Sequence, residues 1–553
     1  MNAPLNLIVV ALAMAVALGW AGLRTQRALH LLQLDSYANH RLVQWLLAEP
    51  RNRLIELRSG LCHVVFLALA LVLPLGFIDG ALLLAGWAVC AAGLLLYAYR
   101  QAGAPKKPLV YTGRARRILG TSLAISSAVM GLSTWFALSL LQPDLSLALK
   151  AHAVLVILLA ALLVIQLSPL TTVLANLILM PVQHAINRMY LRRAQHRLRD
   201  VQPLVVGITG SYGKTSTKYL LEQLLTNHRR VLKTPLSYNT MMGVCRVINE
   251  SLDANHEVFI AEMGAYRRGD IKELSDFVRP TIGILTAIGP QHLERFKTID
   301  NIQATKYELI EALPASGVAI FNNDDPRCRA LADCTAHVRV MRYGLDTAGQ
   351  TLDLWAEHIA MGPEGLSFTL ASQDGRQVKV RTILLGHHNV LNILGASCAA
   401  LAIGIPFDDL AQGIQDLPAV PHRLQLLDNG SGVTVIDDSY NSNPIGAMEA
   451  LKVLSSFTTG QRILVTPGMV ELGSLEAHLN EELGAKAAEV CDYVVLVGVE
   501  RTKPLAAGLQ AKNFPSEKIR VVRDLKGATI VLPTIVGMGD TVLFENDLPD
   551  QYT

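Results

Sequence analysis

The sequence predicts an α-helical membrane domain followed by α/β domains, and two observations carry this prediction. Hydrophobic residues make up 51% of the 553 residues and charged residues only 17%, which is too apolar for a wholly soluble protein. The apolar excess lies almost entirely in residues 1–181, whereas from residue 203 short β-rich runs alternate with helical stretches. The net charge of +3 gives no indication of nucleic-acid binding.

The membrane domain is predicted to contain five spans. They occupy residues 5–23, two stretches within residues 61–99, residues 118–141 and residues 151–180. The first run carries no charge and is long enough, at about 1.5 Å per residue, to cross a hydrocarbon core of about 30 Å. Asp79 beside Gly80 marks a tight turn between the second and third spans. Pro169 is expected to kink or end the fifth.

Basic residues gather in alternate loops and predict the orientation of the spans. Residues 24–60, residues 100–117 and the stretch after residue 181 are rich in arginine and lysine, whereas the other connections carry almost none. Basic loops stay in the cytoplasm, so we expect the N-terminus outside a bacterial inner membrane and everything after the fifth span inside. Residues 182–202 form a basic connector, either an amphipathic helix along anionic headgroups or a solvated connector helix.

The first α/β unit contains a phosphate-binding pattern. Residues 203–209 predict a strand, residues 210–215 (Gly-Ser-Tyr-Gly-Lys-Thr) a glycine-rich turn, and residues 216–227 a helix. Backbone N–H groups of such a turn and the helix N-terminus favour phosphate. The candidate phosphate-binding residues are Gly210, Ser211, Gly213, Lys214, Thr215 and Ser216. Lys214 would reach the outer phosphates of ATP, and Thr215 would ligate Mg²⁺.

Several segments in order resemble the Mur ligases, enzymes that form amide bonds using ATP. The phosphate loop is one, and the others are residues 261–265, 286–294, 304–308, 322–326 and 386–392. Residues 437–444 and 468–473 are most similar to the MurF branch, which adds D-alanyl-D-alanine to a muramoyl tripeptide. The resemblance implies a P-loop central ATP-binding domain over residues 203–420 and a Rossmann-like C-terminal domain over residues 421–553.

The resemblance also implies roles for residues outside the phosphate loop. Glu262 would hold one Mg²⁺ with Thr215, and His292 would hold a second with Lys306. Lys306 would be carbamylated, because an ammonium repels a metal ion whereas a carbamate offers the oxygen ligands that Mg²⁺ prefers. Lys214, Glu262, His292 and Lys306 would form the catalytic set.

Four further residues would contact the nucleotide. They are Asn322, Asn389, Arg423 and Asp438. Structural alternatives stay open for several candidates: Lys306 as a solvated lysine on an amphipathic helix, Asn389 as a helix cap, and Asp438 as a turn former.

The implied protein is a membrane-anchored ligase that activates a carboxylate as an acyl phosphate and joins it to an amino acid or short peptide in cell-envelope synthesis. In a typical MurF, a soluble N-terminal domain grips the uridine diphosphate part of the substrate; here the membrane domain stands in its place. The acceptor is then lipid-linked or UDP-linked, and the membrane domain binds it or tethers the ligase near membrane lipids and envelope-synthesis partners. The alternatives are a poly-amino-acid polymer ligase and a non-catalytic ATP-binding membrane scaffold.

Overall fold

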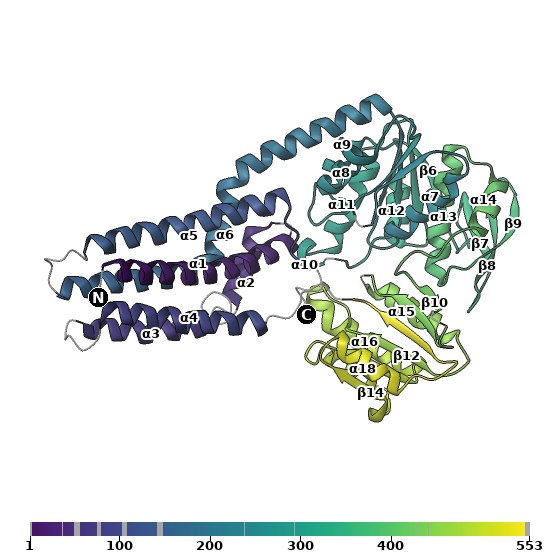
Figure 1. The fold of residues 1–553 in the computed structure, drawn as a ribbon. Helices are drawn as coiled ribbons and strands as arrows, with labels where there is room; N and C mark the ends of the chain where they lie inside the picture. Colours follow the sequence, from purple (N-terminus) through teal and green to yellow (C-terminus); the bar gives the residue numbers. More distant parts are fainter. Residues whose placement is uncertain are drawn as a thin grey trace. The chain divides into compact units, whose positions relative to one another are not determined.

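The computed structural model describes residues 3–35, 37–48, 56–73, 79–101, 108–140, 147–236, 238–291, 293–428, 430–440 and 442–547. The chain separates into two compact units, one ending at Ile186 and the other beginning at Asn187 (Figure 1). The first unit is helical, and the second contains two β-sheets.

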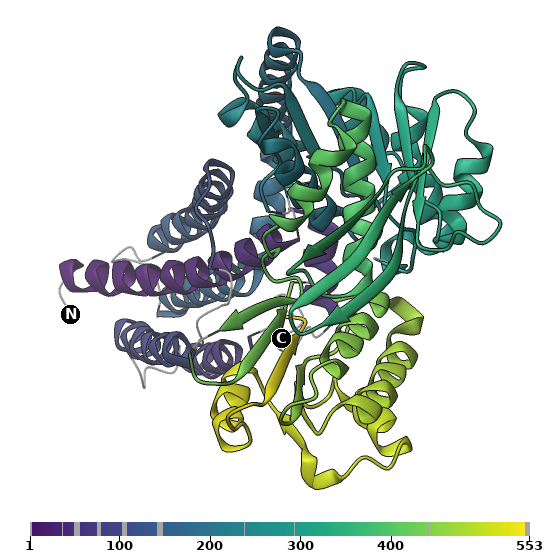
Figure 2. The same ribbon diagram turned by 90° about the vertical axis from the view of Figure 1, so that its right-hand side faces the viewer.

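The first unit is a bundle of apolar helices (Figures 1 and 2). They are α1 (Ala3–Leu34), α2 (Asn39–Ala48), α3 (Leu57–Val72), α4 (Gly80–Gln101), α5 (Gly113–Ser139) and α6 (Leu147–Val201). By length and composition, α1, α4, α5 and α6 could each cross a membrane. The remaining predicted span corresponds to α3, whose 16 residues rise only about 24 Å at about 1.5 Å each. Four of the five predicted spans are therefore supported, and their orientation stays a prediction.

Polar contacts join the helices of the bundle. Arg24 Nη1 donates to Gln166 Oε1 at 2.9 Å, and Gln166 Nε2 donates to Ser59 Oγ at 2.9 Å. Trp20 Nε1 donates to a carboxylate oxygen of Glu56 at 2.7 Å. These bonds connect α1, α3 and α6, and such interhelical bonds fix the helix register, because apolar surface gives little specificity between helices in lipid.

Helix α6 continues through two prolines, Pro169 and Pro181. Of the two predicted effects of Pro169, the end of the helix is therefore wrong, because the helix continues past this residue. A proline lacks the N–H that would bond the carbonyl four residues earlier, here Ile165. The hydroxyl of Ser168 donates to that carbonyl at 2.8 Å, so the helix loses little hydrogen bonding at this point.

The last turns of α6 belong to the second unit. Ala194 is fully buried in the apolar core of that unit, and Leu198 packs against the same core. Arg197 Nη1 donates to the carbonyl oxygen of Asn249 at 2.6 Å, and Asn249 Nδ2 donates to the carbonyl of Tyr190 at 3.0 Å. The predicted connector is thus the end of a 55-residue helix. Its apolar face lies against protein, which neither the headgroup nor the solvent alternative anticipated.

The larger sheet of the second unit has nine strands in the order β2-β3-β1-β4-β5-β6-β7-β8-β9. The strands are β1 (Leu204–Thr209), β2 (Val231–Lys233), β3 (Val258–Glu262), β4 (Ile282–Leu285), β5 (Val318–Asn322), β6 (Arg339–Gly344), β7 (Leu354–Gly362), β8 (Gly365–Ser372) and β9 (Gln377–Thr382). Pairing is parallel from β2 to β7, and β8 and β9 add antiparallel strands. Parallel strands place their carboxyl ends at one edge, where ligands of open α/β sheets bind.

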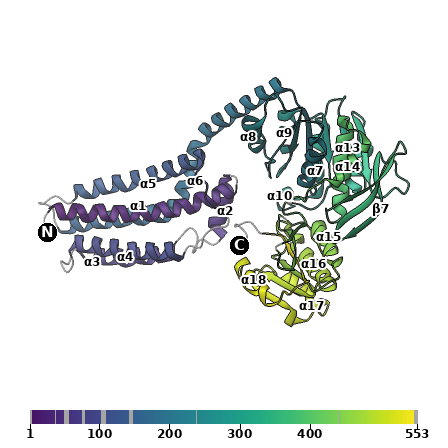
Figure 3. The same cartoon turned by 45° about the vertical axis from the view of Figure 1, so that its right-hand side comes forward.

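Helices cover both faces of this sheet. They are α7 (Lys214–Thr226), α8 (Met241–Ser251), α9 (Asp270–Val278), α10 (Leu293–Phe296), α11 (Ile299–Glu311), α12 (Pro326–Cys334), α13 (His387–Ile403) and α14 (Phe407–Gln415). Helices α7, α13 and α14 lie side by side in Figure 3 and share one apolar core with the sheet. Helices α8, α9, α11 and α12 share the other core, which also receives the end of α6. Both faces are therefore buried, as parallel sheets require.

The smaller sheet follows in the order β10-β11-β15-β12-β13-β14. Its strands are β10 (Gln425–Asp428), β11 (Thr434–Asp438), β12 (Arg462–Thr466), β13 (Tyr493–Val497), β14 (Ile519–Val522) and β15 (Thr541–Glu545), with helices α15 (Pro444–Ser455), α16 (Glu476–Val490), α17 (Lys503–Ala511) and α18 (Leu525–Val531). All pairs are parallel except β10 with β11. The predicted α/β fold class is confirmed.

Candidate active site

The phosphate loop connects β1 to α7, and two glycines give it its shape. A Cβ on Gly210 would lie 1.9 Å from Thr286 Oγ1, so the loop can approach β4 only because this residue has no side chain. Gly213 has a φ of 80° and precedes α7, and a Cβ there would lie 2.4 Å from Asn392 Oδ1. Left-handed backbone and close approach both favour glycine. The loop therefore presents backbone rather than side chains at the N-terminus of a 13-residue helix.

Lys214 folds back over this loop. Its Nζ donates to the carbonyl oxygens of Gly210 at 2.6 Å and Ser211 at 3.2 Å. Burial lowers the pKa of Lys214 to about 8, an effect that the negative charge of Glu262 partly offsets. The ammonium is held where a phosphate on the loop would meet it, and an anion there would raise the pKa again.

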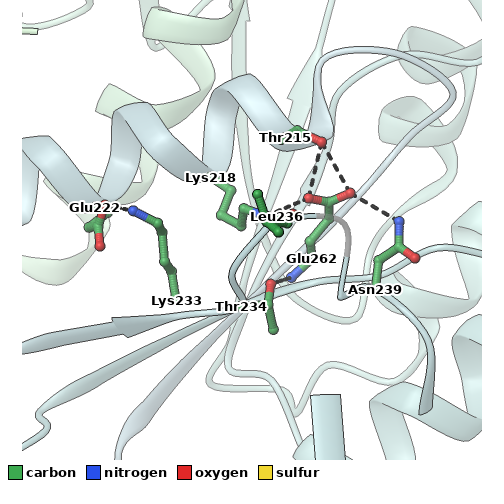
Figure 4. A network of polar contacts seen from close by, with 8 residues as sticks. All are labelled: Thr215, Lys218, Glu222, Lys233, Thr234, Leu236, Asn239 and Glu262. Atoms are coloured by element: carbon green, nitrogen blue, oxygen red, sulfur yellow. Dashed lines mark hydrogen bonds and ion pairs between the residues drawn. The ribbon is translucent and has the colours of Figure 1, made fainter. Parts of the chain in front are cut away.

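Glu262 is the centre of a polar network at the carboxyl end of β3 (Figure 4). Its side chain is almost fully buried, with 1% of the residue exposed. Thr215 Oγ1 donates to it at 3.1 Å, Lys218 Nζ donates to Oε2 at 2.7 Å, and Asn239 Nδ2 donates to Oε1 at 3.1 Å. The backbone N–H of Glu262 donates to Thr234 Oγ1 at 3.1 Å. A buried carboxylate is tolerable only with such partners.

The Thr215–Glu262 pair fits a Mg²⁺ ion. A hydroxyl and a carboxylate are hard oxygen donors, and Mg²⁺ in nucleotide sites takes one or two such protein ligands, with phosphate and water oxygens completing its shell. The described residues contain no cluster of three or more His, Cys, Asp or Glu side chains that could hold a metal by themselves. The predicted ligand His292 lies outside the described residues.

Lys306 lies on α11 with only 4% of the residue exposed. Its amine has no hydrogen-bond or ion-pair partner within the described part of the chain. Burial, together with the positive charge of Lys214, lowers the pKa of Lys306 well below its usual range. The alternative of a solvated lysine on an amphipathic helix is therefore wrong, because the side chain is buried against the sheet.

Several predicted contact residues use their polar groups within the protein. Ser211 Oγ donates to the carbonyl of Gly289 at 3.0 Å, and Asn322 Nδ2 donates to the carbonyl of Thr286 at 2.9 Å. Asn389 Nδ2 donates to the carbonyl of Leu385 at 2.8 Å. These side chains hold the loops around the phosphate-binding turn. Any contact with a nucleotide would therefore use their remaining hydrogen-bond donors and acceptors or the neighbouring backbone.

The remaining loop candidate, Ser216, is buried in the first turn of α7. It forms part of the helix that presents the loop.

Arg423 and Asp438 lie together near the start of the smaller sheet. The guanidinium of Arg423 stacks 4.7 Å from the centre of the Tyr440 ring. Asp438 ends β11 and accepts the backbone N–H of Leu424 at 3.3 Å. Burial raises the pKa of Asp438 to about 6, and the charge of Arg423 opposes the rise. Arginine and carboxylate in one place can orient a polar ligand, and their contact with a nucleotide stays a prediction.

Lys218 and Asn239, which complete the set of polar partners around Glu262 (Figure 4), are not among the site residues predicted from the sequence. Lys218 stands four residues after Lys214, so a helical repeat places both on the same face of α7. That spacing was a usable signal once the helix was assigned. Asn239 lies in the irregular segment between β2 and α8, and its proximity to Glu262 could not be read from the sequence.

Comparison with known proteins identifies the family of this chain. The Mur ligase middle domain matches residues 208–400, and the Mur ligase glutamate ligase domain matches residues 422–545. The chain belongs to the Mur ligase family, whose members are ATP-dependent, ADP-forming ligases.

Within that family the chain is similar to MurF enzymes. It is 29% identical over 354 residues to the UDP-N-acetylmuramoyl-tripeptide–D-alanyl-D-alanine ligase of Bacillus subtilis, covering 64% of this chain and 75% of the relative. The same enzyme of Mycobacterium leprae is 30% identical, with 62% and 70% covered. The Mycobacterium bovis enzyme is 34% identical, and the matched region covers 54% of this chain and 59% of that enzyme.

Solved structures agree with this likeness. MurF from Thermotoga maritima in complex with ADP is 28% identical, with a TM-score of 0.57 and 65% of this chain and 80% of that chain covered. MurF from Acinetobacter baumannii is 26% identical, with a TM-score of 0.58 and coverage of 65% and 77%. The predicted family, fold class and enzyme class are confirmed.

Proposed function

We propose that the protein is a membrane-anchored, MurF-like ligase that joins a carboxylate to an amino acid or short peptide in peptidoglycan-type synthesis. The observation that carries this proposal is a phosphate loop whose Thr215 Oγ1 lies 3.1 Å from Oε2 of the buried Glu262. The chain is also similar to MurF over both ligase domains. The two substrates named for those relatives are the first candidates: a muramoyl tripeptide as the carboxylate and D-alanyl-D-alanine as the amine.

The chemistry requires activation of a poor electrophile. ATP, when bound, supplies a phosphoryl group that turns the carboxylate into an acyl phosphate, which an amine then attacks to give an amide and phosphate. In this chain, the loop N–H groups would bind the phosphates, and Lys214 Nζ would leave the loop carbonyls to neutralise charge on the outer phosphates. Thr215 and Glu262 would hold Mg²⁺ beside them. Arg423 and Asp438 would orient the nucleotide from the C-terminal domain.

Lys306 would act after carbamylation. A buried amine without an acidic partner is largely neutral, and a neutral amine reacts with carbon dioxide, whereas an ammonium does not. The burial of Lys306 and the lowering of its pKa support this modification. The carbamate oxygens would then join His292 at a second Mg²⁺.

The apolar bundle would anchor the ligase in the inner membrane, with the N-terminus outside and the ligase domains in the cytoplasm. Four helices of sufficient length and apolarity support the anchoring, and the basic loops support the orientation. Both family matches lie beyond this bundle, at residues 208–545. The acceptor is accordingly proposed to be lipid-linked or UDP-linked.

The test is phosphate release from ATP by the full chain in detergent or nanodiscs. We expect release to require a muramoyl tripeptide acceptor and D-alanyl-D-alanine together, and Lys214→Ala to abolish it. Release driven instead by glutamate or another single amino acid would favour a polymer ligase. Tight ATP binding without release for any acid and amine would contradict the ligase proposal and favour a scaffold.

A further inference from the structure

The first helical turns of α7 present two lysines with different partners. Lys214 lies over the phosphate loop, whereas Lys218, one turn later, points to Glu262 (Figure 4). The Lys218 side chain is fully buried, with an exposed fraction of 0%. Its Nζ contacts Glu262 Oε2 at 2.7 Å and the carbonyl oxygen of Leu236 at 2.6 Å. Because its ammonium already has these two protein partners, Lys218 is not available to bind phosphate as Lys214 would.

Stability alone does not account for this buried ion pair. Removing an ammonium and a carboxylate from water is costly, and apolar residues of similar volume commonly stabilise a fold as well or better. What the pair does provide is geometry. Lys218 holds Oε2 from α7 while Asn239 holds Oε1 from the segment after β2, so the carboxylate is clamped from two sides.

The clamp leaves the carboxylate facing Thr215. Thr215 Oγ1 lies 3.3 Å from Oε1 and 3.1 Å from Oε2. Lys218 also ties down the carbonyl of Leu236, three residues before Asn239. One ammonium thus fixes both the carboxylate and the chain segment that supplies its other donor.

We propose that Lys218 is a positioning residue, which holds Glu262 so that it and Thr215 present oxygen ligands to the Mg²⁺ of the bound nucleotide. The proposal rests on the proposed function for its Mg²⁺–nucleotide site. It assigns Lys214 to phosphate and Lys218 to the metal ligand. Groups that orient metal ligands typically change metal affinity about 10- to 100-fold when removed.

The matched control is Lys233. It forms an ion pair with Glu222 next to the same helix and stacks on Tyr219, 4.1 Å from the ring centre. It contacts neither Glu262 nor Thr215 by any bond in the described chain. Lys233→Met and Lys218→Met therefore remove the same charge from neighbouring positions, and only the second removes a contact with Glu262.

The experiment measures binding of a fluorescent ATP analogue to the full chain in detergent as Mg²⁺ is titrated. For Lys218→Met we expect the Mg²⁺ midpoint to rise at least about tenfold, with binding in EDTA changed less than about threefold. Lys218→Arg should recover part of the loss, since it keeps a donor charge, and Lys233→Met should match the wild type. Glu262→Gln should show the same raised midpoint, and adding Lys218→Met to it should change nothing further.

Three results would overturn the proposal. One is an unchanged Mg²⁺ midpoint in Lys218→Met. Another is equal weakening of binding with and without Mg²⁺, which would make Lys218 a phosphate ligand or a general stabiliser. The third is a full additional shift in the Glu262→Gln background. If Lys218→Met does not fold, Lys218→Arg carries the comparison, with a smaller rise of the Mg²⁺ midpoint expected and an unchanged midpoint counting against the proposal. The titration needs no acceptor or amine, so failure of the ligase reaction would leave this result independent.

Discussion

The end of α6 should be an integral part of the ligase fold, although the sequence places it outside that fold. Two fragments, residues 187–553 and residues 203–553, differ only in these turns and allow a direct comparison. The shorter fragment loses the burial of Ala194 and of the partly buried side chains packed beside it. Those side chains are Leu191, Leu198 and Val201. It also loses the Arg197–Asn249 and Asn249–Tyr190 hydrogen bonds.

The magnitude follows from these contacts. Full burial of a Leu or Val side chain is worth about 1.5–3 kcal/mol, so three half-buried side chains and one fully buried alanine contribute about 4 kcal/mol. Each of the two hydrogen bonds adds about 1 kcal/mol. A loss of about 6 kcal/mol is a large part of the 5–15 kcal/mol by which domains are typically stable. We expect the melting temperature to fall by at least about 10 °C.

The assay is thermal unfolding followed by circular dichroism, with ANS fluorescence reporting the uncovered core. Arg192→Ala in the longer fragment is the control, since Arg192 is exposed on the same turns, and it should leave the midpoint unchanged. Ala194→Asp should reproduce most of the loss. Equal midpoints for the two fragments would mean that these turns do not stabilise the ligase fold, and would restore the boundary at residue 203.

Three further outcomes are expected. Gly210→Ala should abolish binding of an ATP analogue, because its Cβ would collide with Thr286, while Gly362→Ala, with open space around it, should bind normally; normal binding by both would contradict the loop geometry. Lys306→Ala should lose phosphate release, with part restored by a short-chain carboxylate, and a fully active variant would exclude the carbamate. Burial raises the pKa of Glu545 to about 7. The folded state therefore keeps a proton on this carboxyl group that the unfolded state releases above about pH 4.5. As the pH rises from about 5 to about 8, the free energy of unfolding should fall by up to about 3 kcal/mol because of this group. Glu545→Gln should flatten that fall in thermal melts, and an unchanged slope would argue against the shift.

Local sequence was sufficient for the features that depend on neighbouring residues. The glycines and lysine of the loop predict a phosphate site because backbone freedom, helix N-terminus and charge all lie within six residues. Apolar runs predict helices long enough for a bilayer, and four of five meet that length. Lys306 was a candidate only through family resemblance, and its burial could not be read from one helix, since the sheet that covers it comes from distant strands.

The order of the domains, the phosphate loop and the likeness to the Mur ligases can all be read from the amino-acid sequence, because each depends on contiguous residues. Two features depend on how the whole chain folds: Lys218 and Asn239 contact Glu262, and the last turns of α6 complete the ligase core. A buried carboxylate and an uncovered apolar face must find partners, and chain topology rather than local pattern determines which residues those partners are.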